Sequence, residues 1–213
     1  MNAREAILER VTHALGAAAA PPAPPRAYRR AGSRPAASRV ALFCERVAEY
    51  RADVRRVHAA ELAGAVADVC RSLRASRLAV PADLPTAWRP DGIELVEDAL
   101  LAPRDLDALD GVLTGATAAI AETGTIVLSS GPREGRRALT LVPDLHLCVV
   151  EEAQIVELVP EAFARLTELV TRERRPLTFV SGPSATSDIE LSRVEGVHGP
   201  RTLVVFVVPE EES

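Results

Sequence analysis

Apolar residues recur along this chain with spacings that separate helices from strands. Residues 2–15, 40–50 and 59–75 repeat apolar side chains every three or four positions, which predicts amphipathic helices. Short apolar or alternating runs predict strands at residues 52–57, 77–80, 93–96, 126–128, 145–150, 177–180 and 202–208. A further helix is expected from Pro160 to about residue 171, because proline suits the first helical turn.

Strands and helices alternate over most of the chain, and this order predicts the fold class. Residues 52–80 read as strand, helix and strand, a unit that closes a parallel sheet with a right-handed crossover. We therefore expect an α/β domain with an open, mostly parallel sheet flanked by helices. Ligands of such sheets bind beyond the carboxyl ends of the strands. Residues 112–121 fit either a helix or a strand.

A proline-rich segment separates the first helix from the rest of the chain. Residues 17–37 hold few core-forming side chains and the prolines Pro21, Pro22, Pro24, Pro25 and Pro35. Such a composition is typical of an extended or mobile linker. We therefore divide the chain into a detachable N-terminal helix with its linker, residues 1–37, and an α/β domain, residues 38–213. The helix either docks on a partner or another copy, or packs back on its own domain.

Composition narrows the partners and the chemistry. A formal net charge of −5 gives no general attraction for nucleic acid or for anionic lipid. All 25 cationic side chains are arginine, which excludes a Schiff-base lysine and the lysine of a P-loop. Cys44, Cys70 and Cys148 lie far apart, so we expect buried structural thiols and no iron–sulfur cluster on this chain. Without a signal-peptide pattern or a long apolar run, the sequence predicts a cytoplasmic protein.

The segment 115–131, GATAAIAETGTIVLSSG, is the first candidate for chemistry. A tight turn at Gly124 can point successive backbone N–H groups at a phosphate or carboxylate, with hydroxyl groups beside them. Glu122 is the first candidate catalytic residue, as an acid, base or nucleophile. The candidate ligand-binding residues here are Thr123, Gly124, Thr125, Ser129, Ser130, Gly131 and Arg137. The alternative is that the threonines only cap the turn and that Glu122 is solvated.

The segment 181–190, SGPSATSDIE, follows another apolar run and is equally polar. Asp188 is the second candidate catalytic residue, although an aspartate that begins a short helix would also be explained as its cap. The candidate ligand-binding residues here are Ser181, Gly182, Ser184, Thr186, Ser187, Glu190 and His198. We interpret the two segments as halves of one pocket for a small anionic ligand. No spacing of histidine, cysteine and acidic residues matches a zinc signature, so we expect no metal site.

These motifs resemble those of the lactate utilization protein C family, the LUD-domain or YkgG-like proteins. The resemblance rests on segments 115–128, 143–146, 181–190 and 196–208. It implies a fold related to the sugar-phosphate isomerase, CoA-transferase and formyltetrahydrofolate cyclo-ligase group. One departure is Ala185, where we expect the family to carry a basic residue in the second segment.

The resemblance also implies a function. It points to a component that oxidises L-lactate to pyruvate together with iron–sulfur partner proteins, with the cluster on a partner and a ligand of the lactate, nucleotide or CoA type. A different class is a stand-alone CoA-transferase-like or cyclo-ligase-like enzyme with Glu122 as the nucleophile. A third is a scaffold whose pocket is unused.

Overall fold

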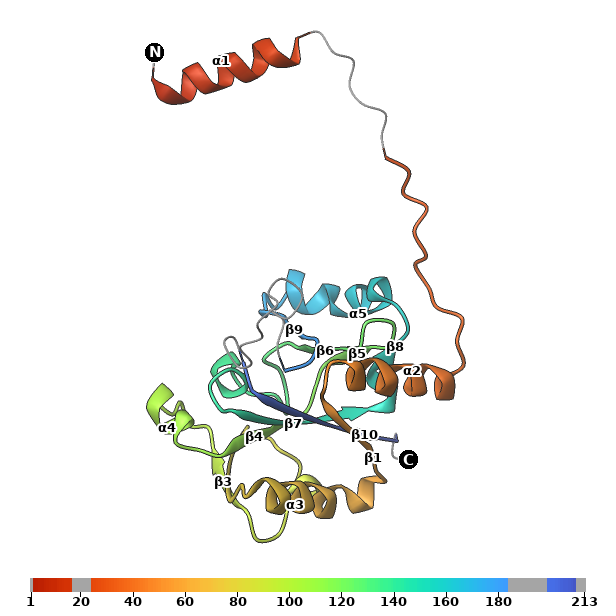
Figure 1. The fold of residues 1–213 in the computed structure, drawn as a ribbon, viewed down its shortest axis with the longest axis vertical. Coiled ribbons are helices and arrows are strands. Elements are labelled where there is room, and N and C mark those ends of the chain that lie inside the picture. The colour runs from red at the N-terminus through yellow and green to blue at the C-terminus, as the bar shows by residue number, and fades with distance from the viewer. Residues whose placement is uncertain (1, 17–23, 184–198, 210–213) are drawn as a thin grey trace.

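The fold is built from two stacked sheets, as the computed structural model of residues 2–16, 24–183 and 199–209 shows (Figure 1). The larger sheet has six parallel strands in the order β1-β10-β7-β4-β2-β3. These strands are β1 Asp53–Arg56, β2 Arg77–Val80, β3 Glu94–Glu97, β4 Gly111–Thr114, β7 Leu145–Glu151 and β10 Thr202–Val208. The predicted α/β class with a mostly parallel sheet flanked by helices is confirmed.

The second sheet was not expected from the sequence. Its order is β8-β5-β6-β9, formed by β5 Ala118–Ile120, β6 Thr125–Leu128, β8 Ile155–Val156 and β9 Thr178–Val180. β6 runs antiparallel to both β5 and β9. The link between β5 and β6, residues 121–124, is far shorter than the dozen or so residues that a parallel crossover needs. The two strands therefore form a hairpin, and this hairpin is the centre of a separate sheet.

Helices pack against both sheets (Figure 1). They are α2 Ala36–Glu49, α3 Leu62–Leu73, α4 Pro103–Asp107 and α5 Val159–Thr171. α3 and α5 cover the two outer faces, and α2 lies between the larger sheet and the smaller one. One core cluster joins α3 to one face of the larger sheet, and a second joins α2 and the smaller sheet to the opposite face. A third cluster joins α5 to the far side of the smaller sheet. The layers are thus α3, the larger sheet, α2 with the smaller sheet, and α5.

Successive side chains along β5 and β6 point to opposite faces, so the smaller sheet contributes to two core clusters. Ala119 and Ile126 pack toward α2 and the larger sheet, whereas Ile120 and Val127 pack toward α5. Successive side chains of a strand point to opposite faces, so a sheet buried on both faces needs apolar residues at every position. All of β5 and β6 is buried accordingly.

The first helix, α1 Ala3–Leu15, stands apart from the domain at the end of the linker (Figure 1). Its start is stabilised by a capping box, in which Asn2 Oδ1 accepts from the Glu5 N–H and Glu5 Oε2 accepts from the Asn2 N–H, each at 2.9 Å. None of its residues is buried. Within the described part of the chain, no helix is long and apolar enough to cross a membrane.

Candidate functional site

The turn between β5 and β6 carries Glu122 and is anchored on its neighbours. The Glu122 N–H donates to the Glu157 carbonyl oxygen at 3.0 Å, and the Gly124 N–H lies 3.4 Å from the Ala121 carbonyl oxygen. Gly124 has a φ of +59°, as expected for a tight turn, and a Cβ there would lie 2.7 Å from the carbonyl carbon of Arg46 in α2. The turn is therefore pressed against α2, and two of its N–H groups already have acceptors.

Gly124→Ala is expected to lower the free energy of unfolding by about 2 kcal/mol. Residue 124 has a left-handed backbone conformation, and the added methyl group would meet the backbone of α2. Urea unfolding followed by circular dichroism measures the loss. Gly92→Ala is the matched control, since Gly92 also has a positive φ, +77°, but no atom within 4 Å of its ideal Cβ. Equal losses in the two variants would show that the contact with α2 contributes nothing.

The starts of the two polar segments lie side by side. β6 pairs with β9 so that Ile126 is opposite Val180, which sets Ser181 beside Thr125. The Oγ atoms of Thr125 and Ser181 are 2.8 Å apart, and those of Thr123 and Thr125 are 2.7 Å apart. Gly182 follows with a φ of +78° and packs its backbone against Tyr50. The predicted residues Ser184, Thr186, Ser187, Asp188, Glu190 and His198 lie outside the described residues.

Ser129, Ser130 and Gly131 lie at the opposite end of β6, and the N–H groups of Ser129 and Gly131 are already used. One carboxylate, that of Glu134, accepts from the Ser129 N–H at 2.7 Å, the Gly131 N–H at 3.0 Å and the Thr117 hydroxyl at 2.5 Å. Glu134 is only 1% exposed. Ser130, with a φ of +53°, completes the bend between the two amides. The anion that this loop binds is therefore a side chain of the protein itself.

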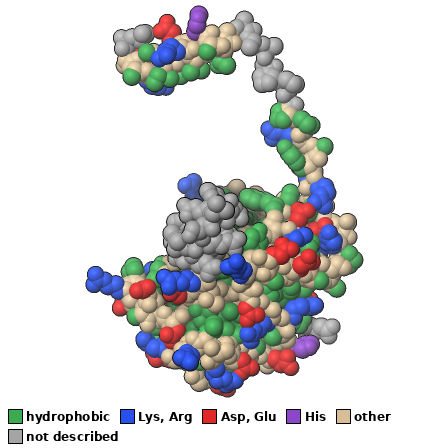
Figure 2. All heavy atoms as spheres, in the orientation of Figure 1, with side chains coloured by type: hydrophobic (Ala, Val, Ile, Leu, Met, Phe, Trp, Pro, Cys, Tyr) green, Lys and Arg blue, Asp and Glu red, His purple; other side chains and the backbone are tan. Residues whose placement is uncertain are grey.

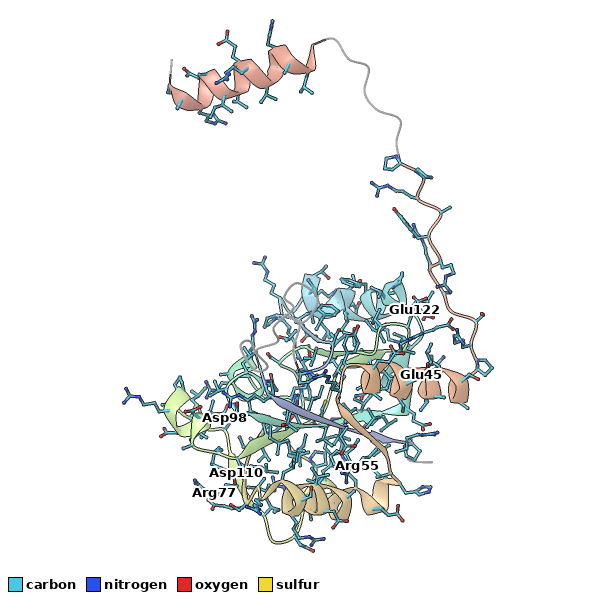
Figure 3. All side chains as sticks on the ribbon, in the orientation of Figure 1. Glu45, Arg55, Arg77, Asp98, Asp110 and Glu122 are labelled. Carbon is cyan, nitrogen blue, oxygen red and sulfur yellow. The ribbon has the colours of Figure 1, made fainter. Side chains whose placement is uncertain are left out.

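Arg137 also lies away from Glu122. It is exposed at the start of the short helix η3 Arg137–Thr140, directly after Arg136. Arg136 binds Asp98 at 2.6 Å, and Figure 3 shows Asp98 on the far side of the domain from Glu122. The predicted pocket thus divides into a part around Thr125 and Ser181, a closed Glu134 loop and a distant arginine.

Glu122 itself is half exposed and has a cationic partner. Its Oε1 lies 2.5 Å from Nη2 of Arg29, a residue of the linker, and its side chain is 47% exposed. Two more carboxylates, Glu157 and Glu161, bind the same stretch of linker. Within the described residues, Glu122 is therefore accompanied by further carboxylates and by the Arg29 guanidinium.

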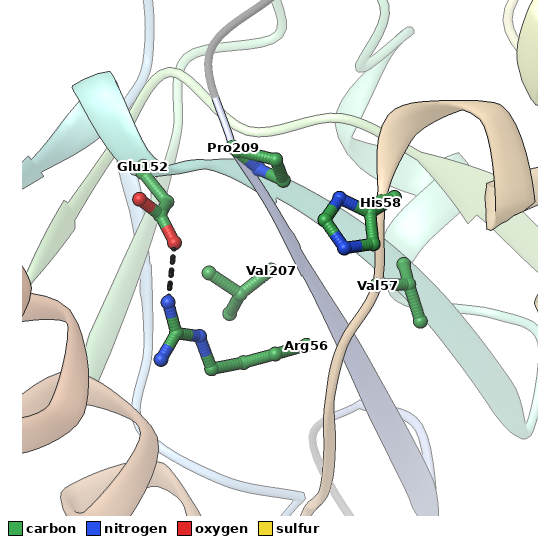
Figure 4. Close-up of a pocket in the computed structure, with 6 residues that line it drawn as sticks. All are labelled: Arg56, Val57, His58, Glu152, Val207 and Pro209. Carbon is green, nitrogen blue, oxygen red and sulfur yellow. Dashed lines mark hydrogen bonds and ion pairs between the residues drawn. The ribbon is translucent and has the colours of Figure 1, made fainter.

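A cavity at the carboxyl ends of the strands of the larger sheet is a second candidate ligand site. It measures about 330 Å³ and is lined by Arg56, Val57, His58, Glu152, Val207 and Pro209. Arg56 ends β1, Pro209 follows β10, and Glu152 follows β7. Arg56 Nη2 donates to Glu152 Oε1 at 2.9 Å, and His58 faces this pair across Val207 (Figure 4). We call this cavity the carboxyl-edge pocket.

Sequence reasoning missed the carboxyl-edge pocket although a signal was present. Arg56 lies near the end of the predicted strand 52–57 and His58 directly follows it, at the end of the sheet where ligands bind. What the sequence does not show is that β10 lies next to β1 and that β7 lies next to β10. This order brings Glu152 to Arg56 across a gap of 96 positions.

The three thiols and the imidazole of His146 are buried or half-buried. Cys70 and Cys148 are buried, and burial raises the pKa of the Cys70 thiol to about 11. Cys44 on α2 is half-buried, and desolvation likewise raises its pKa. His146 on β7 is buried, and its Nε2 lies 2.8 Å from the hydroxyl of Thr114 on β4. In the described part of the chain, no three possible metal ligands come together.

Comparison with known proteins gives consistent matches. The LUD domain model matches residues 102–208. Lactate utilization protein C of Deinococcus radiodurans is 51% identical over 167 residues, which are 78% of this chain and 77% of that protein. Shorter matches are 38% identity with Lactate utilization protein C of Bacillus pumilus, over 43% of this chain and 39% of that protein, and 35% with the uncharacterized protein YkgG of Escherichia coli K12, over 43% and 40%.

A solved structure is also similar. The crystal structure of a DUF162 family protein from Deinococcus radiodurans has a TM-score of 0.73 and 43% sequence identity to this chain. The match covers 83% of this chain and 99% of the crystallised one. The likeness therefore extends over almost the whole length of that protein.

Proposed function

Because this chain belongs to the LUD domain family, we propose that it takes part in lactate utilisation, as a component that acts with iron–sulfur partner proteins in the oxidation of L-lactate to pyruvate. The observation that carries the proposal is the 51% identity, over most of both chains, to a protein named Lactate utilization protein C. The thiols of this chain give it no evident role as the electron carrier, and the cluster is proposed to reside on a partner.

Co-purification tests the partnership. A tagged chain isolated from cells grown on L-lactate is expected to bring down proteins that contain iron and acid-labile sulfide, and a deletion strain is expected to grow poorly on L-lactate but normally on glucose. Normal growth of the deletion strain on L-lactate would contradict the role in lactate utilisation. An eluate without iron, from a strain that needs the protein, would contradict only the partnership.

We further propose that the small anionic ligand binds in the carboxyl-edge pocket rather than between the 122–131 and 181–190 segments. Arg56 donates to Glu152 through Nη2, and a guanidinium has further N–H donors that match a carboxylate. Val207 and Pro209 offer apolar surface for a short carbon chain. The loop after β6 already holds the Glu134 carboxylate, which supports this choice, whereas residues 184–198 of the other proposed pocket lie outside the described residues.

Arg56→Ala is expected to weaken binding of L-lactate or pyruvate by about tenfold or more, because it removes a charge-assisted hydrogen bond. Isothermal titration calorimetry of the purified chain measures the affinity. Arg55→Ala is the matched control, since Arg55 precedes it on β1 but pairs with Asp53 at 2.8 Å and does not line the pocket. An equal loss in both variants, or no effect of Arg56→Ala on measurable binding, would contradict the placement.

A stand-alone enzyme that uses Glu122 remains a second candidate, favoured by the exposure of that carboxylate. The chemistry would be attack of the Glu122 carboxylate on an acyl-CoA thioester, which gives an acyl anhydride and releases the CoA thiolate. Incubation with acyl-CoA followed by trapping with hydroxylamine and mass spectrometry measures it. A Glu122 side chain that stays unmodified would contradict this reading.

A further inference from the structure

Six residues of the linker lie against a row of three carboxylates on the domain. We call residues 29–34, RRAGSR, the strap, and Glu122, Glu157 and Glu161 the acidic row. Arg29 contacts Glu122 at 2.5 Å, as described above. The Gly32 N–H donates to Glu161 Oε1 at 3.1 Å, and the Arg34 N–H donates to Glu157 Oε2 at 2.7 Å. Figure 2 shows acidic and basic side chains gathered where the linker reaches the domain.

Two of these contacts are made by backbone N–H groups, which gives the strap a defined register on the row. Glu161 uses its second oxygen, Oε2, to accept from the Leu158 N–H at 2.7 Å at the start of α5. The position of the Glu161 carboxylate is therefore fixed by a contact within the start of α5, independently of the strap. Although desolvation raises it, the N–H groups of Leu158 and Gly32 hold the pKa of Glu161 below its ordinary value. A carboxylate held in this way is ready to accept from an extended backbone.

Position 32 of the strap requires glycine because the strap backbone lies very close to Glu157. A Cβ at this position would lie 2.3 Å from Glu157 Oε2 and 2.5 Å from Glu157 Cβ. The Glu157 side chain is 7% exposed, so it has little room to move aside. Gly32 is not in the left-handed region, and the need for glycine here comes from the close approach alone.

Charge also favours a cationic occupant. The acidic row brings three carboxylates to one stretch of the linker, and a nearly buried polar group such as the Glu157 side chain is stabilised by hydrogen-bond donors. The strap supplies N–H donors at Gly32 and Arg34 and a guanidinium at Arg29, and the Arg34 Nε lies 3.6 Å from Glu157 Oε1. Exposed ion pairs contribute little by themselves, so the backbone contacts to Glu157 and Glu161 carry the specificity.

We propose that the acidic row is a docking surface for an extended segment with arginine and glycine at these spacings, and that the strap of the same chain occupies it. This goes beyond the role in lactate utilisation and does not depend on it. While docked, the strap pairs Arg29 with Glu122 and covers Glu157. Release of the strap frees both carboxylates and the linker that leads to α1.

Hydrogen exchange of the full-length chain, resolved by residue with NMR, tests the docking directly. The Gly32 and Arg34 amides are expected to be protected, and Gly32→Ala is expected to lower their protection by about tenfold or more. Ser33→Ala is the matched control, because Ser33 lies between the two contacts and is exposed. Exchange of both amides at the intrinsic rate in the unmodified chain, or unchanged protection in Gly32→Ala, would overturn the proposal.

A second measurement follows Glu122. Its rate of coupling to a water-soluble carbodiimide and glycine amide is expected to rise in Gly32→Ala and in Arg29→Ala but not in Arg30→Ala, whose side chain is exposed beside the strap contacts. Equal rates in all four proteins would overturn the shielding of Glu122. Light scattering at the NMR concentration and at a hundredfold dilution shows whether the strap on each domain comes from the same chain or from a second copy. A dimer whose amides lose protection on dilution would overturn occupancy by the same chain.

Discussion

Glu134→Ala is expected to lower the free energy of unfolding by about 4 kcal/mol, because several buried donors lose their acceptor at once. The Ser129 and Gly131 N–H groups both donate to Oε2, and the Thr117 hydroxyl donates to Oε1. A methyl group reaches none of them. Urea unfolding followed by circular dichroism gives the difference, provided that the slope of the transition is unchanged.

Glu134→Gln is the informative control. Its amide oxygen can still accept from the Ser129 and Gly131 N–H groups, and its NH2 group can donate to Thr117, since a hydroxyl accepts as well as donates. We expect a loss of about 1 kcal/mol for this variant. A loss in Glu134→Ala no larger than in Glu134→Gln would show that the loop after β6 does not depend on the carboxylate.

Acidification from about pH 6.5 to about pH 4 is expected to remove about 3 kcal/mol of stability through His146. Burial lowers the pKa of His146 to about 4. The unfolded chain takes up a proton near pH 6.5, whereas the folded chain stays neutral until about pH 4. The unfolded state therefore binds more protons in this window, so stability falls as the pH falls and this contribution levels off below about pH 4.

The measurement is a series of urea unfolding curves between pH 7.5 and pH 4 for three proteins. His146→Gln is expected to flatten the slope of stability against pH, since the amide keeps a donor for Thr114 and does not titrate. His58→Gln, made at an exposed position, is expected to leave the slope as it is. A slope that is the same in the wild-type chain and in His146→Gln would contradict the assignment.

Periodicity predicted three of the helices and most strands of the larger sheet, but residues 112–121, which hold most of β4 and all of β5, fitted either a helix or a strand. Strands were also predicted at the positions of β6 and β9, but not their pairing in a separate, partly antiparallel sheet. β5 and β6 are short and buried on both faces. Such strands show no alternation. The short link at residues 121–124 is the feature that distinguishes an antiparallel hairpin from another parallel strand.

The candidate site was predicted less well, for reasons that differ between residues. The contact between Thr125 and Ser181 followed from two polar segments at strand ends. Glu134 was not among the predicted residues, although only three positions separate it from the Gly131 amide that it binds. Arg29 meets Glu122 across 93 positions, and no local pattern reports a contact of that range.

The position of β10 has a consequence for how the chain matures on the ribosome. This strand is the last in sequence, but it lies between β1 and β7, and β1 pairs with no other strand in the described part of the chain. Until residues 202–208 have formed β10, β1 has no neighbouring strand to pair with, and one edge of β7 is unpaired. Pairings of such sequence separation form slowly, and unpaired edges invite association. Until β10 has formed, the chain therefore exposes strand edges that are buried in the folded sheet.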